Sequence, residues 1–426
     1  MRGCGPLKLA VIDANYNDRI FSGLAATWLR WELEQAGVKE STPEEADVLL
    51  VTVSSQQGIK AVKRELRRVN NKRAKVILGG GGCYAPAVFD DVADVICVGE
   101  GPRFVRTLLS DGYDAVCALP EAWQPGDTRM VDPGREFPWE LPPLMNTDGF
   151  VRLFASRGCR YRCLFCQTGW EAPYRVHPDM GSVCRLAQRL TREGRQLAIV
   201  TNDGAEEHIR LAGQQEFLSM RVDNLKRIMP LSRAVTKSVR LGVEGVSERL
   251  RKAVGKPVSN DDLLRLSFDL LSAGVGVRWF FISGLPGETA ADYDELRYLV
   301  SGLKRLPKGV VMMNFHAFIP QPATPLSVLP LRDEYWEPFD EFRRWFFHGP
   351  GFTRRVQIVA PARYQGRLAR AMESMAATEE ELRRGWWEQD NPNWRVRYLA
   401  APDRLRKIAR VYARRVGQNA NTQKGI

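Results

Sequence analysis

At residues 156–166 the sequence reads Ser156-Arg-Gly-Cys159-Arg-Tyr-Arg-Cys163-Leu-Phe-Cys166, with three cysteines separated by three and two residues. The apolar run 151–155 before it predicts a strand, so the cysteines are expected on the loop that follows a strand, where their thiolates can turn toward one point. Zinc sites usually take four ligands, and no fourth Cys or His is close by in the sequence. Three thiolates suit a 4Fe–4S cluster with one iron open to another ligand. We therefore expect Cys159, Cys163 and Cys166 to be catalytic ligands of such a cluster.

Strand and helix patterns alternate on both sides of this motif and predict an α/β protein. Residues 120–143 contain six prolines and little periodicity, which is typical of a connector between domains. The expected parts are a parallel α/β domain at 1–120, a proline-rich linker at 121–150, a second α/β domain at 151–330 and a basic, mainly helical region at 331–426.

The three-cysteine motif with Phe165 resembles the signature of the radical S-adenosylmethionine (radical SAM) enzymes. Four further segments resemble parts of that family's barrel. Residues 217–225 and 239–251 resemble two core strands, 281–289 resemble the strand and turn beside the adenine, and 314–326 resemble the last strand. The resemblance implies a partial (β/α)6 TIM-type barrel at 151–330. It also implies that the open iron chelates S-adenosylmethionine (SAM). One electron from an external flavodoxin- or ferredoxin-type donor then cleaves SAM to methionine and a 5′-deoxyadenosyl radical.

The same resemblance indicates which residues bind SAM. Arg221 and Glu244 stand at the carboxyl ends of predicted parallel strands, where barrel enzymes place ligand-binding groups. An interior salt bridge is the alternative for each of them, and Asp223 is a candidate partner of Arg221. The candidate SAM-binding residues are Phe165, Asn202, Asp203, Arg221, Glu244, Arg251, Gly284 and Pro286.

The first domain is similar to the flavodoxin-like cobalamin-binding domain that precedes the barrel in one branch of the radical SAM enzymes; the matching segments are 46–54, 77–82 and 93–101. Ligands of such sheets bind outside the carboxyl ends of the strands. The candidate cobalamin rim consists of Ser54, Ser55, Gln56, Gly80, Gly81 and Cys83.

Two features of the first domain limit its chemistry. Residues 1–176 contain no histidine, so any cobalamin is expected to bind without a histidine ligand, and the alternative is a structural remnant that binds none. Cys83 is either an axial or reactive thiol or a buried apolar cysteine. The methylthiotransferases share this layout and hold a second cluster with three extra cysteines. Here the strand ends at 13–15 and 53–54 carry no cysteine, so we expect no second three-cysteine cluster.

The basic residues are concentrated at the C-terminal end of the chain. The net charge is +12, and residues 351–426 hold 16 Lys and Arg against 7 Asp and Glu. Such a surplus, with tryptophans among arginines, favours nucleic acid, whose bases stack and whose phosphates pair. A solvated basic face and tryptophans that pack a small domain are the alternatives. The candidate nucleic-acid contacts are Trp394, Arg395, Arg397, Arg410 and Arg414.

Composition and motifs together leave three functions. The first is a radical SAM enzyme that modifies a DNA or RNA base. The second is a cobalamin-dependent radical SAM methyltransferase that acts on a small metabolite or peptide. The third is a non-enzymatic iron–sulfur or nucleic-acid-binding protein. No run of eighteen uncharged apolar residues and no secretory leader pattern is present, so we expect a cytoplasmic protein without a membrane partner and with reduced cysteines.

Overall fold

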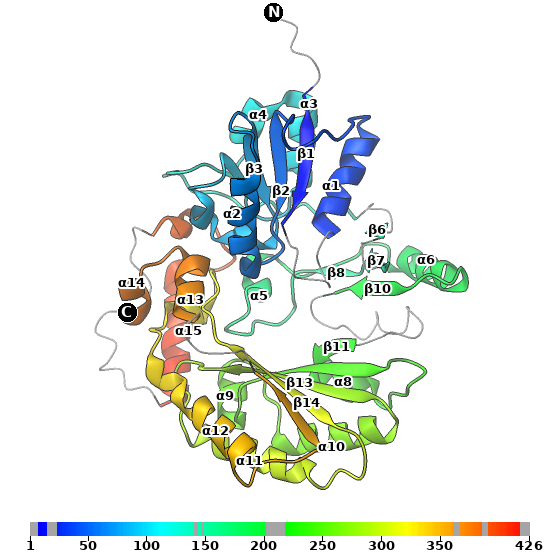
Figure 1. The fold of residues 1–426 in the computed structure, drawn as a ribbon, viewed down its shortest axis with the longest axis vertical. Coiled ribbons are helices and arrows are strands. Elements are labelled where there is room, and N and C mark those ends of the chain that lie inside the picture. Colours follow the sequence, from blue (N-terminus) through cyan, green and yellow to red (C-terminus); the bar gives the residue numbers. More distant parts are fainter. Residues whose placement is uncertain are drawn as a thin grey trace, which may run out of the picture. The chain divides into compact units, whose positions relative to one another are not determined.

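The computed structural model describes residues 7–14, 24–139, 144–145, 149–201, 218–360, 367–385 and 391–417. The chain forms two compact units (Figure 1). Unit 1 comprises Met1–Leu153, Met372–Ala377 and Glu388–Ala401, and unit 2 comprises Phe154–Ala371, Thr378–Trp387 and Pro402–Ile426. Residues of the C-terminal region 331–426 therefore occur in both units. Within the described ranges, no helix is both long and apolar enough to cross a bilayer.

Unit 1 is built on a five-stranded sheet in the order β1-β2-β3-β4-β5. The strands are β1 (Leu9–Asp13), β2 (Val48–Thr52), β3 (Lys75–Gly79), β4 (Val95–Cys97) and β5 (Ala122–Trp123). The first four are parallel, and β5 is antiparallel to β4. The predicted parallel sheet is confirmed, but its order differs from the flavodoxin order 2-1-3-4-5. The segment before β2 fastens β1 beside it, because Ser41 N–H donates to Leu9 O at 2.8 Å and Lys8 N–H to Asp47 Oδ2 at 2.9 Å.

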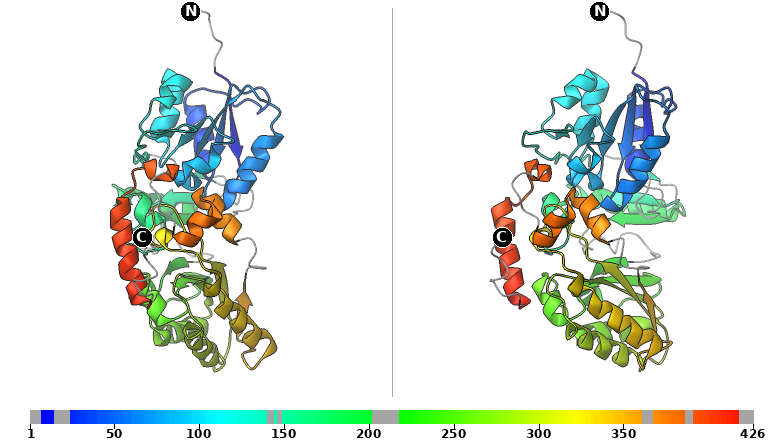
Figure 2. Two further views of the ribbon diagram at one scale, coloured as in Figure 1. Left: turned by 90° about the vertical axis from the view of Figure 1, so that its left-hand side faces the viewer. Right: turned by 60° about the vertical axis from the view of Figure 1, so that its left-hand side comes forward.

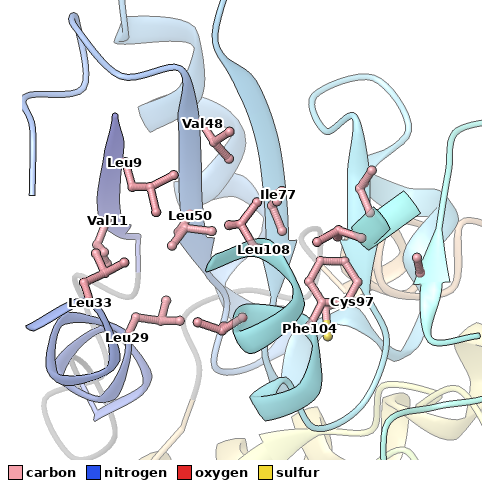
Figure 3. Packing of buried hydrophobic residues seen from close by; sticks show 14 of the residues in the cluster. Leu9, Val11, Leu29, Leu33, Val48, Leu50, Ile77, Cys97, Phe104 and Leu108 are labelled. Carbon is pink, nitrogen blue, oxygen red and sulfur yellow. The ribbon is translucent and has the colours of Figure 1, made fainter. Parts of the chain in front are cut away.

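Two helices cover one face of this sheet with apolar side chains (Figure 3). Pro102 in the first turn begins α3, where its missing N–H costs no helical hydrogen bond. The packed side chains are Leu9, Val11, Leu50 and Ile77 from the strands, Leu29 and Leu33 from α1, and Phe104 and Leu108 from α3. The helices of unit 1 are α1 (Leu24–Gln35), α2 (Ile59–Arg68), α3 (Pro102–Asp111) and α4 (Tyr113–Cys117).

Part of the proline-rich stretch is built into unit 1. Trp123 in β5 is fully buried, and its indole N–H donates to Asp90 Oδ1 at 2.9 Å. Further along, Val131 N–H donates to Arg395 O at 2.6 Å, and Arg397 N–H donates to Val131 O at 2.8 Å. These bonds hold the late segment 391–401 onto the stretch that follows β5.

Unit 2 contains a second five-stranded sheet, in the order β11-β12-β13-β14-β15, and all of its neighbouring strands are parallel. The strands are β11 (Leu218–Arg221), β12 (Ser238–Glu244), β13 (Gly276–Ser283), β14 (Val311–Ala317) and β15 (Val356–Val359). Helices alternate with them: α8 (Val222–Ile228), α9 (Glu248–Ala253), α10 (Asn260–Ser272), α11 (Asp292–Leu303) and α12 (Glu337–His348). This confirms an α/β architecture with parallel sheets, while closure into a (β/α)6 barrel stays a prediction.

Burial alternates along the strands of unit 2, which assigns their side chains to two faces. On β13, Trp279 is fully buried and its indole N–H donates to Ser267 Oγ of α10 at 3.2 Å, so this face packs against helices. The alternate positions are partly buried or, at His316, exposed, and form what we call the second face of the sheet. Its members on the three longest strands include Arg240, Gly242, Glu244, Arg278, Phe280, Ile282, Met312, Asn314 and His316.

The described residues also form further strands, which pair as β10-β7-β6 and β8-β9, and further α-helices. They are β6 (Leu144–Met145), β7 (Val151–Phe154), β8 (Ser156–Arg157), α5 (Thr168–Glu171), β9 (Arg175–Val176), α6 (Met180–Arg192), β10 (Leu197–Val200), α13 (Arg367–Met375), α14 (Glu379–Arg384) and α15 (Pro402–Arg415). In Figure 2, α15 is the long helix in red. The C-terminal region, predicted to be mainly helical, also supplies β15, because Val356–Val359 has the apolar composition of a strand.

Candidate active site

The three cysteines lie on a loop that is closed by a short antiparallel pair. Strands β8 and β9 pair through Ser156 with Val176 and Arg157 with Arg175. Inside the loop, Cys166 N–H and the indole N–H of Trp170 both donate to the carbonyl of Cys163, at 3.2 and 3.0 Å. The backbone around Cys163 therefore has a fixed direction.

Gly158 allows this loop to close. Its φ is +67°, and a Cβ there would lie 2.5 Å from Pro173 O. A side chain would collide with the returning strand, so the glycine before Cys159 is a packing requirement.

Hydrogen bonds fasten the cysteine loop to the elements that follow two strands of unit 2. Leu164 N–H donates to Val254 O at 3.1 Å, just after α9. Leu164 O accepts from Leu326 N–H at 3.2 Å, and Gln167 N–H donates to Gln321 Oε1 at 2.9 Å; both partners follow β14. The loop thus lies at the carboxyl end of the sheet, where barrel enzymes place their chemistry.

Two cations lie beside the central thiol. Cys163 is buried, and Cys159 and Cys166 are partly buried. The Arg221 Nη1–H donates to Cys163 Sγ at 3.1 Å. Burial raises the pKa of the Cys163 thiol, while the charges of Lys256 and Arg221 act against that shift. A cationic surrounding of this kind favours a thiolate and a cluster ligand.

Arg221 ends β11 and is held from several sides. Its Nε–H donates to Asp223 Oδ1 at 2.9 Å, and Nη2–H donates to Asp223 Oδ2 at 3.1 Å. The guanidinium lies over the ring of Tyr161 at 3.9 Å, and the Tyr161 hydroxyl donates to Asn224 Oδ1 at 2.6 Å. Most of its N–H groups already have acceptors, so Arg221 is placed to act on the Cys163 sulfur.

Glu244 forms the interior ion pair that the sequence analysis gave as its alternative, and its partner is Lys256, which the sequence did not single out. Its Oε1 accepts from Lys256 Nζ at 2.7 Å, and only 15% and 10% of the two side chains are exposed. Lys256 also donates to Gly242 O at 3.2 Å and lies over the Phe165 ring at 6.0 Å. A Cβ on Gly242 would lie 2.6 Å from both charged atoms, so the pair depends on this glycine.

No sequence pattern singles out Lys256, because it belongs to neither a strand nor a helix period. It follows Gly255, whose φ of +87° turns the chain back after α9 toward the strand ends. A lysine after a helix-ending glycine is ordinarily a solvated residue, and only the fold places this one next to Cys163.

The Arg251 guanidinium is engaged by acceptors of the chain itself. It is fully buried; Nε–H donates to Val258 O at 2.7 Å, Nη1–H to Gly245 O at 3.2 Å and Nη2–H to Asn260 Oδ1 at 2.5 Å. Burial lowers its pKa to about 10. With all three nitrogens engaged, this side chain braces the 245–260 segment beneath the site.

The turn after β13 is rigid. The buried Glu288 carboxyl accepts from Gly284 N–H at 3.0 Å, Leu285 N–H at 3.2 Å and the Tyr293 hydroxyl at 2.6 Å. Burial, opposed by these donors, raises the pKa of Glu288 to about 8. A Cβ on Gly284 would lie 2.3 Å from the Trp336 ring, so only glycine fits there. Asn202 and Asp203, also predicted to bind SAM, lie outside the described residues.

The model of the Radical SAM superfamily matches residues 153–299, which contain this loop and the ion pairs around it. This chain is a radical SAM enzyme.

Two relatives of this radical SAM enzyme have names that refer to a ribosomal protein and to tRNA. The ribosomal protein uS12 methylthiotransferase RimO of Desulforudis audaxviator is 25% identical over 70% of this chain and 71% of its own. The tRNA-2-methylthio-N(6)-dimethylallyladenosine synthase of Nitrosomonas eutropha is 22% identical over 68% and 71%. Among solved structures, the methyltransferase TsrM of Kitasatospora setae, with cobalamin and a 4Fe–4S cluster bound, gives a TM-score of 0.52 at 14% identity over 99% of both chains. That likeness shows a shared fold.

The cofactors of a radical SAM enzyme are a 4Fe–4S cluster and SAM, and the thiols of the described loop fit the cluster. Three thiols share one anchored loop, with Arg221 donating to one of them. The described residues contain no set of three His, Cys, Asp or Glu side chains grouped around one metal ion. A cluster does not need such a set, because its thiolates bind different irons.

The predicted cobalamin rim of unit 1 is present only in part. Ser54, Ser55 and Gln56 are partly exposed after β2, and Gly81 is exposed after β3. Cys83 does not belong to the rim: it is fully buried, and burial raises its pKa, so the apolar alternative describes it.

The glycines of this rim serve loop packing. A Cβ on Gly80 (φ +118°) would lie 2.3 Å from Val53 O, and one on Gly81 would lie 2.7 Å from Ser54 O. The loops after β2 and β3 are therefore in direct contact. A larger residue at Gly81 would displace the loop itself, whether or not a flat ligand binds over it.

Three of the predicted nucleic-acid contacts hold unit 1 together. Arg395 Nη1–H donates to Asp127 O at 2.6 Å, and Arg397 pairs with Asp132 at 3.2 Å. The Trp394 ring meets Tyr398 edge-on at 6.3 Å. Trp394 and Arg395 fit the packing alternative, whereas the Arg397 side chain is 60% exposed and its ion pair lies at the surface. Trp386 and Trp387, in the same pattern, lie outside the described residues.

Proposed function

We propose that this radical SAM enzyme is a transferase that modifies a base of a nucleic acid and binds the phosphates with α15. The observation that carries the proposal is the charge of this helix. It has six Lys and Arg and one Asp, and its cations include the exposed Arg404, Lys407, Arg410 and Arg414 at spacings of three or four residues. Such spacing sets them along one side of the helix, as phosphate binding requires.

Helix α15 is fixed beside the reacting end of the sheet in unit 2. The Tyr412 hydroxyl donates to Pro286 O at 2.8 Å, in the turn after β13. Arg249 Nη1–H donates to Val416 O at 2.9 Å, and Arg249 also pairs with Asp292 at 2.6 Å. A phosphate held by Arg410 or Arg414 would therefore lie near the carboxyl end of the sheet, where Glu244 lies.

The proposal gives each residue of the site a role. The bound cluster supplies the electron that cleaves SAM. Lys256 and Glu244 present one cation and one anion at the end of β12, which suits the carboxylate and ammonium groups of the methionine end. Arg221 stabilises the negative charge on the Cys163 sulfur, and Phe165 gives Lys256 an apolar wall that excludes water.

The test of nucleic-acid binding uses salt dependence. We expect a structured RNA hairpin to bind the reconstituted enzyme with an affinity that falls steeply with salt, because neutralised phosphates release counterions. Replacement of Lys407, Arg410 and Arg414 by Gln should flatten the slope of log K against log salt by about 2. The matched control replaces Arg185, Arg189 and Arg192, exposed on α6, and should leave the slope unchanged. Equal slopes in both variants, or no binding at low salt, would refute the proposal.

A second candidate is a cobalamin-dependent radical SAM methyltransferase that acts on a small metabolite or peptide. The observation in its favour is that a fold relative with bound cobalamin covers 99% of the chain. Corrinoid content after anaerobic purification with added cobalamin tests it. Ser55→Trp puts bulk on the partly exposed rim and should abolish uptake, whereas Ser110→Trp, at an exposed position of α3, should not. No corrinoid in the wild type would leave unit 1 as a structural remnant.

A further inference from the structure

Two arginines lie side by side on the second face of the unit 2 sheet. Arg240 on β12 and Arg278 on β13 are in register as direct neighbours across parallel strands. Like charges in this position destabilise a sheet. Burial lowers the pKa of Arg240, and the charge of Arg278 lowers it further, which is the sign of two cations held close together.

No described side chain neutralises Arg278. Within the described ranges it has neither a hydrogen-bond acceptor nor a carboxylate partner, and its register neighbour on β14 is the uncharged Met312. The next strands outward place Ser219 and Gln357 in the same row, and neither carries a charge. Arg240 and Arg278 are therefore the two cations of a row whose other members, Ser219, Met312 and Gln357, are uncharged.

The same face leads from these arginines to the reacting groups. Gly242, two residues beyond Arg240, lies under the Lys256–Glu244 pair. At a rise of about 3.3 Å per residue, Arg240 is roughly 13 Å from Glu244 along β12. Phe280 lies at the intermediate level, in register with Gly242, and its ring is parallel to that of His316 farther along β14, with centroids 5.8 Å apart and planes inclined by 5°. A flat, partly apolar surface thus separates a cationic pair from the SAM-binding end.

We propose that Arg240 and Arg278 form the binding site for an oxyanion of the substrate, a phosphate or a carboxylate, whose body lies along Phe280 and His316 toward Glu244. Two neighbouring guanidinium groups offer paired N–H donors that match the oxygens of either anion. The site goes beyond the nucleic-acid proposal, since it serves a nucleotide phosphate and the carboxylate of a small substrate equally.

Binding of the simple anions tests the site in the reconstituted full-length enzyme saturated with SAM. The variant in which Lys407, Arg410 and Arg414 are Gln is the background, so that phosphate on α15 does not contribute. Titration calorimetry with inorganic phosphate and with acetate should show saturable binding of at least one; the tighter one assigns the substrate anion.

Three further substitutions decide the outcome. Arg278→Gln should weaken anion binding at least tenfold, and Arg278→Lys should weaken it less, because the charge remains but the paired donors are lost. Arg305→Gln, at an exposed position of unit 2, should leave it unchanged. No saturable binding in the background protein, or equal affinity in Arg278→Gln and Arg305→Gln, would overturn the proposal. Neither result bears on the salt slope of RNA binding, so the two proposals fail separately.

Discussion

Replacement of Lys256 by Met is the sharpest test of the active site, because it separates binding of SAM from stability. The substitution keeps the length of the side chain but leaves the Glu244 carboxylate without the partner now at 2.7 Å. Breaking a buried ion pair costs about 3–5 kcal/mol, and the small residual exposure of both side chains favours the lower end, about 3 kcal/mol. At roughly 2–4 °C per kcal/mol, the melting temperature of the enzyme should fall by about 6–12 °C.

The same substitution should weaken SAM binding. One lost hydrogen bond to a charged group is worth about 2 kcal/mol, which is about 30-fold in the dissociation constant. Equilibrium dialysis of SAM against the anaerobically reconstituted enzyme measures it, and iron content checks that the cluster is present. Lys252→Met, on the exposed side of the same helix end, is the matched control and should change neither quantity.

Combining Lys256→Met with Glu244→Gln gives the decisive comparison. Neutralising the orphaned carboxylate should recover most of the lost melting temperature, because no buried charge remains unpaired. SAM affinity should stay low, because both charges that bind its methionine end are gone. A double variant with recovered stability and normal SAM affinity would show that the pair only supports the fold, which refutes the reasoning.

Three other outcomes follow from the contacts described. Cys163→Ala should abolish reductive cleavage of SAM and reduce reconstituted iron below the ~4 per chain of an intact cluster, since alanine has no thiolate; retained cleavage would contradict the cluster assignment. Glu288 has a pKa raised to about 8, so native protein holds its proton more tightly than unfolded protein, and stability should fall as pH rises from about 5 to 8. Thermal melts should show a smaller pH dependence in Glu288→Gln, and identical slopes would sink this interpretation. Arg395→Gln, unlike the α15 substitutions, should lower the melting temperature without changing the RNA salt slope.

The cluster ligands could be predicted from sequence because their chemistry requires cysteine at fixed spacing on one loop. Arg221 and Glu244 were also accessible, since both end apolar strand patterns. Lys256 was not, because its place beside Cys163 depends on the turn after α9, which brings together residues 93 positions apart in the chain. The strand order in unit 1 was not predicted either, because the apolar pattern of a strand does not specify which neighbour it pairs with; β1 pairs with β2 over Leu9–Asp13.

The C-terminal residues show why charge counting alone misleads. Arg395 and Arg397 contribute to the basic surplus as much as Arg410 and Arg414 do, yet the first two are engaged with Asp127 and Asp132. Arg395 uses a donor within unit 1, and Arg397 shares its charge with Asp132 in an exposed ion pair, so equal counts of charge do not mean equal readiness to bind a phosphate.

The cations of α15 and those of the second face differ in the kind of anion that each can bind. Arg410 and Arg414 lie on the outside of an exposed helix, which suits a long polyanion that slides over a surface. Arg240 and Arg278 are partly buried neighbours on a sheet, so we expect them to bind a single anionic group of the substrate. A nucleic acid satisfies both when one nucleotide leaves its stack and enters the site, whereas a small metabolite satisfies only the second. The α15 variant should therefore lose activity on RNA while phosphate still binds at the sheet. That result would mean that α15 selects a nucleic acid as the substrate and that Arg278 positions the reacting nucleotide.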